Sequence, residues 1–156
     1  MSHKNREWKV TSLELSQKLD VEHRRLGIVV ESEWYWVNMG RPNGRANWKL
    51  IIRNNGKNKI YPHIDGHPDW SIIPALDTSE LGEMLPSYIV SDNQECSLEQ
   101  YGEDDFSIEY QSDFAIRDGM KSAFCPFTVI EKYEAEARGT MRLWLLQNGY
   151  VKGEGK

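Results

Sequence analysis

The first half of the chain opens with apolar residues at helical spacing. Leu15, Leu19 and Leu26 recur every four to seven positions, which places them on one side of a helix. The preceding Thr11-Ser12-Leu13-Glu14 has the form of a capping box, in which Thr11 is the N-cap and Glu14 reaches back to it. Gly27 offers a left-handed stop. The pattern predicts a helix from about Thr11 to about Leu26.

After this helix the spacing changes to two, as in strands. The run 33–39 is rich in aromatic and β-branched residues, and in the next run Trp48, Leu50 and Ile52 alternate with Lys49, Ile51 and Arg53. Asn55-Gly56 then favours a tight type I′ turn, which leads to a further strand at Lys59–Tyr61. The pattern predicts a three-stranded antiparallel meander.

A short helix with strong local signals lies in the middle of the chain. Asp77 is its predicted N-cap, Glu80 completes a capping box, and Leu76 can pack on Leu81 as a hydrophobic staple. Pro86 ends it, because the residue before a proline avoids the helical region. A helix of barely two turns is not stable alone, so its apolar side chains are expected to pack on the sheet.

The second half predicts one strand, a short hairpin partner and a long helix. Alternation supports a strand at 105–111, with 114–116 as its partner. Thr128 and Glu131 form a third capping box ahead of a long helix that ends at Asn148-Gly149. Gly139 inside this helix suggests close packing at that point. The expected apolar stripe is Ile130, Tyr133, Ala137, Met141, Trp144 and Leu145.

These elements predict an α+β fold in a single domain covering 1–156. The expected architecture is a mostly antiparallel sheet, a three-stranded meander plus a C-terminal hairpin, packed by three helices of which the C-terminal one is long. The ends, 1–9 and 152–156, are expected to be flexible.

Composition favours a protein of the reducing cytoplasm. The chain has 156 residues, of which 39% are hydrophobic and 28% charged, and no apolar run reaches the length of a membrane span. The start lacks the apolar segment of a signal peptide. Cys96 and Cys125 form neither a metal-binding spacing nor a disulfide framework.

Charge divides the chain into two unlike parts. Residues 1–60 contain twelve basic and six acidic residues, whereas residues 61–156 contain seven basic and eighteen acidic ones. The segment 92–118 is the most acidic, with nine carboxylates opposed only by Arg117. Such a segment is either a solvated face or a binding surface.

Two sets of residues have the chemistry of a site without its usual context. His63, Asp65, His67 and Asp69 alternate as metal ligands on one face of a strand would, but Gly66 and Pro68 interrupt that strand and a solvated loop is the commoner arrangement. Cys125 lies just before the expected last helix, whose dipole lowers a thiol pKa, yet it lacks a nucleophile signature and a buried inert thiol is favoured. We therefore assign no catalytic, cofactor-binding or metal-binding residue.

Two charged regions suggest binding functions. Cations of the predicted meander, accompanied by Trp34, Trp36 and Trp48, have the composition of a surface that binds phosphates and stacks bases. These cations are Arg41, Arg45, Lys49, Arg53, Lys57 and Lys59. Alternatively, the dense carboxylates of 92–118 imitate a DNA backbone and occupy a host protein.

Several segments, taken in order, resemble a known group of proteins. They are Ser12–Leu19, Glu31–Trp36, Glu80–Pro86, and Glu134–Arg138 running into Trp144–Tyr150. In this order they resemble a group of small uncharacterised proteins encoded by tailed phages and prophages. Glu80-Leu81-Gly82-Glu83-Met84-Leu85-Pro86 is the distinctive piece. The resemblance implies a phage accessory protein that acts in the bacterial cytoplasm, and it carries over no functional residue.

The functional expectation is a non-enzymatic accessory protein, without cofactor, that binds a protein partner. The alternatives are a nucleic-acid-binding regulator acting through the basic meander and an acidic, DNA-mimic type of inhibitor.

Overall fold

The α+β class is confirmed by a computed structural model of the chain, which describes residues 9–38, 48–52, 71–102, 104–112, 115–117, 120–122 and 125–151. The described helices are α2 (Leu13–Arg25), α3 (Thr78–Met84) and α4 (Glu134–Gln147). The described strands are β1 (Trp34–Asn38), β2 (Trp48–Ile52), β3 (Ser71–Ala75), β4 (Tyr88–Ser91), β5 (Gln94–Gly102), β6 (Phe106–Ser112), β7 (Ala115–Arg117), β8 (Met120–Ser122) and β9 (Phe127–Glu131).

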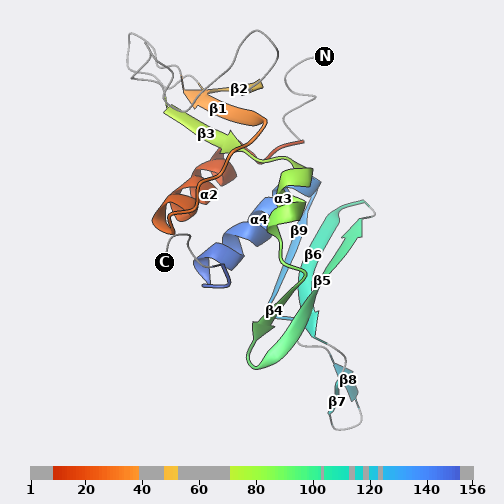
Figure 1. Cartoon of the computed structure of the whole chain (residues 1–156). Helices are drawn as coiled ribbons and strands as arrows, with labels where there is room; N and C mark the ends of the chain where they lie inside the picture. The colour runs from red at the N-terminus through yellow and green to blue at the C-terminus, as the bar shows by residue number, and fades with distance from the viewer. Residues whose placement is uncertain are drawn as a thin grey trace.

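The strands form three antiparallel sheets. One has the order β2-β1-β3, the largest has the order β4-β5-β6-β9, and β7 pairs with β8 alone. In Figure 1 the helices α2, α3 and α4 lie between the first sheet and the second, with α4 running beside the larger one. The buried apolar side chains form three clusters: one between α4 and the larger sheet, one among the three helices, and one against the first sheet.

The first sheet differs from the predicted meander in its third strand. β1 and β2 were predicted and pair antiparallel. The expected strand Lys59–Tyr61 lies outside the described residues, and the described third strand is β3, which pairs with the other side of β1. β3 was not predicted, because Pro74 argues against a strand; it is tolerated here since β3 is at the edge of the sheet.

Helix α2 has the predicted extent but a different cap. Ser12, not Thr11, is the N-cap, and its hydroxyl accepts a hydrogen bond from the Leu15 amide at 3.2 Å. Thr11 is buried instead, with its hydroxyl 2.6 Å from that of Ser16. The predicted Thr11 cap was therefore wrong, whereas the stop at Gly27, whose φ is 71°, is confirmed.

Helix α3 follows its local signals fully. Asp77 accepts from the Glu80 amide at 2.8 Å, and the Glu80 carboxylate accepts from the Asp77 amide at 2.9 Å. Leu76 and Leu81 are buried in one cluster with residues of α2 and α4. Leu81 thus packs between helices and not on the sheet, which corrects the prediction, while Leu85 does pack against the larger sheet.

Helix α4 begins six residues after the predicted cap. Thr128 and Glu131 belong to β9, and the N-cap position is Tyr133. Ile130 and Tyr133 are 65% and 40% exposed, so they lie outside the buried stripe to which they were assigned. The remaining stripe residues are buried or half-buried, and the helix ends at Asn148 followed by Gly149 with φ 79°.

Strand β6 was predicted correctly, but its partners were not. It pairs with β5 and β9, neither of which was predicted, and β4 was missed as well. The segment 114–116 was expected to pair with β6, whereas β7 pairs with β8. Of the ends expected to be flexible, 1–9 and 152–156, only Lys9 is described, in a turn.

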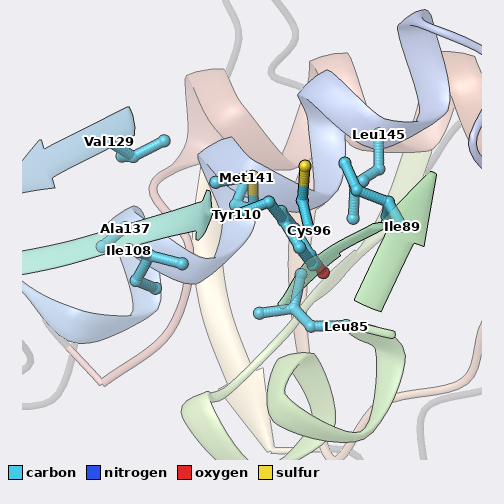
Figure 2. Close-up of a cluster of buried hydrophobic side chains, with 9 residues drawn as sticks. All are labelled: Leu85, Ile89, Cys96, Ile108, Tyr110, Val129, Ala137, Met141 and Leu145. Carbon is cyan, nitrogen blue, oxygen red and sulfur yellow. The ribbon is translucent and has the colours of Figure 1, made fainter. Parts of the chain in front are cut away.

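The main hydrophobic cluster lies between α4 and the larger sheet. Figure 2 shows its nine buried side chains, which come from the end of α3, from β4, β5, β6 and β9, and from α4. They are Leu85, Ile89, Cys96, Ile108, Tyr110, Val129, Ala137, Met141 and Leu145. The Tyr110 hydroxyl donates to the Pro86 carbonyl at 2.7 Å. This cluster fixes the sheet face that looks toward the helices.

The close packing predicted at Gly139 is confirmed, and it gives a stability test. A Cβ atom at this position would lie 2.6 Å from Thr11 Cγ2 and 2.8 Å from Leu15 Cδ2. Gly139→Ala gains about 1 kcal/mol of helix propensity but overpacks buried side chains at a cost of about 1–3 kcal/mol. Because two buried side chains would have to move, we expect a cost in the upper part of this range and a net destabilisation of roughly 1–2 kcal/mol in urea unfolding.

Gly82→Ala is the matched control. Its added Cβ would meet Arg138 Nη1 at 2.6 Å, a side-chain end that donates to the Thr78 carbonyl at 2.6 Å. The gain in helix propensity and the loss of this hydrogen bond are each about 1 kcal/mol, so this variant should stay within about 1 kcal/mol of the parent. A Gly139→Ala protein as stable as the parent would show that the contact with α2 is looser than described.

Candidate functional site

The outer face of the larger sheet is the strongest candidate surface. The cross-strand register places Val90 opposite Glu95, Glu99 opposite Glu109, and Glu109 opposite Thr128. Because side chains alternate along a strand, these residues point away from the cluster under α4. The outer face consists of Tyr88, Val90, Glu95, Ser97, Glu99, Tyr101, Ser107, Glu109, Gln111, Thr128 and Ile130.

Exposed apolar side chains are concentrated on this outer face. Among the described residues, seven large hydrophobic side chains are exposed, and four of them lie here. Tyr88 is 54% exposed, Val90 58%, Tyr101 50% and Ile130 65%. Single exposed apolar residues are ordinary, and it is their position on one face that makes this face a candidate interaction surface.

Carboxylates interleave with these apolar side chains. Glu99 and Glu109 are directly opposite one another on neighbouring strands, an arrangement of like charges that destabilises a sheet. Desolvation, followed by the charges of Glu99 and Glu109, raises the pKa of the Tyr101 phenol. The outer face therefore carries a negative potential that a cationic partner would relieve.

The structure separates the nine acidic residues of 92–118 into three groups. Glu95, Glu99 and Glu109 lie on the outer face. Asp92, Asp104 and Asp105 lie in turns. Glu103, Asp113 and Asp118 are outside the described residues. Sequence reasoning identified the segment but not the set of three that shares a face, because that set depends on strand register.

Cys125 lies beside the same outer face, in contact with a carboxylate. Its Sγ donates to Glu109 Oε2 at 3.1 Å and lies 3.1 Å from Thr128 Oγ1, which itself donates to Glu109 Oε2 at 3.3 Å. Burial, with the hydrogen bond and charge of Glu109, raises the pKa of the Cys125 thiol. Cys125 precedes β9 and not a helix, so the helix-dipole argument does not apply. The thiol is protonated at neutral pH.

This environment predicts slow alkylation of Cys125. Glu109→Gln removes a negative charge that opposes ionisation, so it should lower the thiol pKa and speed reaction with iodoacetamide several-fold at pH 8. Cys96 is fully buried in the native protein, so mass spectrometry of the alkylated chain reports Cys125. An unchanged rate in the Glu109→Gln protein would mean that the carboxylate does not act on the thiol.

A hollow follows strand β4 at the edge of the sheet. Its volume is about 370 Å³, and it is lined by Pro86, Ser87, Tyr88, Ile89, Val90 and Tyr150. Tyr150 is held in place, because its hydroxyl donates to Ser91 Oγ at 2.9 Å and its ring stacks on Trp144 with centroids 5.1 Å apart. The hollow and the outer face share Tyr88 and Val90.

A second hollow lies near the beginnings of α3 and α4. It also measures about 370 Å³, and its apolar walls are Trp34, Phe106 and Tyr133. Its acidic members are engaged within the fold: Asp77 caps α3, and Glu134 pairs with Arg138 at 2.9 Å. It is a weaker candidate than the outer face.

Two buried polar side chains form an internal pair and not a surface site. Arg142 Nε donates to His23 Nε2 at 3.3 Å, and Arg142 Nη1 donates to the Met84 carbonyl at 3.2 Å. His23 and Arg142 are both buried. Burial, followed by the charge of Arg142, lowers the pKa of His23 to about 4. The imidazole is therefore neutral at pH 7 and links α2 to α4.

Most residues of the predicted basic, nucleic-acid-binding surface lie outside the described residues. Lys49 is exposed on β2, while Arg41, Arg45, Arg53, Lys57 and Lys59 lie outside the described residues. Trp36 is buried and its Nε1 donates to the Thr11 carbonyl at 3.0 Å. Trp34 and Trp48 are half-buried against the cluster around Trp36. Trp36 is thus core, and the nucleic-acid hypothesis stays a prediction.

The predicted metal candidates His63, Asp65, His67 and Asp69 also lie outside the described residues. Within the part of the chain that is described, no three His, Cys, Asp or Glu side chains gather in a way that would hold a metal ion. None of the described helices is both long enough and apolar enough to cross a membrane. No protein-family model, curated protein or solved structure matches the chain.

Proposed function

We propose that this chain is a non-enzymatic accessory protein of a phage or prophage that binds a protein partner in the bacterial cytoplasm. The observation that carries the proposal is the outer face, where four exposed apolar side chains surround Glu95, Glu99 and Glu109. Aromatic residues are enriched and hydrophobic contacts are central in protein interfaces. The phage origin rests on the resemblance of the sequence segments, above all Glu80–Pro86.

The proposal that the protein is not an enzyme has support in two side chains. Cys125 is held as a thiol by burial and by Glu109, so it is a poor nucleophile. His23 is buried and accepts its hydrogen bond from Arg142, so it does not reach a substrate at the surface. The position and hydrogen bonding of each side chain are thus accounted for by its role in the fold.

An acidic, DNA-mimic inhibitor is the second candidate. It is favoured by the placement of Glu95, Glu99 and Glu109 on one exposed face. The two candidates differ in salt dependence, because charge pairs at a surface are screened and apolar contacts are not. If the chain is a DNA mimic, its target should dissociate from it as ionic strength rises. Added DNA should also displace the chain from the target.

Recovery of partners from host lysate, with and without nuclease treatment, tests the proposal. We expect the same protein in both samples, retained at moderate salt. Capture of nucleic acid alone would overturn the proposal in favour of the basic regulator. A protein captured only at low salt and released by DNA would favour the mimic.

A further inference from the structure

Among the described strands, β4 forms one edge of the larger sheet. It is terminal in the order β4-β5-β6-β9, and its sequence is Tyr88-Ile89-Val90-Ser91. Natural edge strands are commonly guarded by short length, charges, a proline or a bulge, since free backbone groups recruit further strands. Of these protections β4 has only its length of four residues, because it holds no charge and no proline within its bounds and pairs with β5 without a bulge. Its edge is suited to accept another strand.

The surroundings of β4 supply contacts on both sides of such an added strand. On the outer face lie the exposed side chains of Tyr88 and Val90, with Glu95 opposite Val90 in register. The hollow of about 370 Å³ between Pro86 and the fixed ring of Tyr150 runs beside the same strand. In strand addition, main-chain hydrogen bonds supply affinity and pockets for alternate side chains supply specificity.

The two sides differ in the chemistry they prefer. Side chains that point to the outer face would lie beside Tyr88 and Val90, and long ones could reach Glu95 on β5, which favours cations. On the inner side the hollow presents Ile89 and the ring of Tyr150, which favour apolar groups. A strand that satisfies both would alternate basic and apolar residues.

We propose that an extended segment of the protein partner, with alternating basic and apolar side chains, adds to β4 as a fifth strand of the sheet. This inference rests on the proposed function and names how the partner docks. A second copy of the chain fits less well, because each copy carries a net charge of −5 and would bring its own Asp92, which follows β4, to the same edge.

A synthetic peptide provides the probe. We would titrate acetyl-Lys-Val-Lys-Ile-Lys-Val-amide into the full chain and follow backbone amide signals by NMR, with hydrogen exchange measured at saturation. Strand addition predicts saturable shifts centred on residues 88–91 and slowed amide exchange there. The control peptide has the same side chains but is methylated on every backbone nitrogen, so it lacks the donors that pair with a strand.

Two outcomes would overturn the inference: no shift at β4 at millimolar peptide, or equal binding of the methylated peptide. A dimer that forms without peptide and protects β4 would assign the edge to a second copy instead.

Variants of the protein add an independent measure. Tyr88→Lys with Val90→Lys should weaken the basic peptide at least 10-fold, whereas Ile130→Lys, at the opposite edge of the outer face, should change it less than about 3-fold.

Failure of this inference and failure of the proposed function are distinguishable. If a captured partner requires Glu99 and Glu109 but leaves amide exchange at β4 unchanged, the outer face binds the partner without strand addition. If a variant with Glu99→Lys and Glu109→Lys binds the partner as tightly as the parent chain does, the proposed surface itself is wrong.

Discussion

Acidification from pH 7 to pH 4 is expected to lower the free energy of unfolding by up to roughly 3 kcal/mol through His23 alone. The buried imidazole has a pKa of about 4 against an ordinary value of 6.5. Between these values the unfolded chain binds a proton that the folded chain does not, so protonation favours unfolding. The contribution is fully present above about pH 6.5 and is lost as the pH falls toward 4.

Urea unfolding at several pH values, compared with the His23→Gln variant, isolates this effect. The glutamine carbonyl can still accept from Arg142 Nε, but it does not titrate. Carboxylates affect both proteins alike, so the difference between their pH profiles reports His23. We expect the variant to lose markedly less stability between pH 6.5 and pH 4. Parallel profiles would mean that the imidazole is accessible to protons in the folded state.

Reversal of two charges on the outer face is expected to weaken the protein partner at least 100-fold. Glu99→Lys with Glu109→Lys places two cations on the outer face where we propose that the partner binds, and like charges in an interface cost several kcal/mol. The double variant keeps a like-charged pair across β5 and β6, so the sheet gains no new ion pair. Affinity is measured by calorimetry with the captured partner.

Glu14→Lys with Glu83→Lys is the matched control. These residues are exposed on α2 and α3, away from the outer face, and the change in net charge is identical. We expect a loss below about 5-fold from long-range electrostatics. Equal losses in the two double variants would indicate attraction to net charge and not to a surface.

Local signals predicted those elements whose stabilising contacts are local. Helix α3 is the clearest case, since Asp77 and Glu80 cap one another within four residues. The same form of signal misled at Thr128 and Glu131, because the Thr128 hydroxyl donates across strands to Glu109. A capping box joins residues three apart, whereas the contact that Thr128 makes in the strand pair is with a residue nineteen positions away. The local sequence alone does not decide which of the two contacts forms.

The missed strands β5 and β3 have different physical reasons. β5 runs through polar and acidic residues because one of its faces is solvated, and its inner residues Cys96 and Leu98 are a weak apolar signal. β3 contains Pro74, which only an edge position permits. The acidic segment was evident from composition. That its carboxylates share a face with Val90 was not, because this depends on the pairing of β4 with β5, and neither strand was predicted.

Site-specific cross-linking from the outer face tests the central claim most directly. A photo-reactive amino acid at Ser97, exposed in the middle of the outer face, should join the chain covalently to its protein partner. The same group at Gln17, exposed on α2, should not. Cross-linking from Ser97 alone is the predicted result; cross-linking from Gln17 without Ser97 would contradict the account.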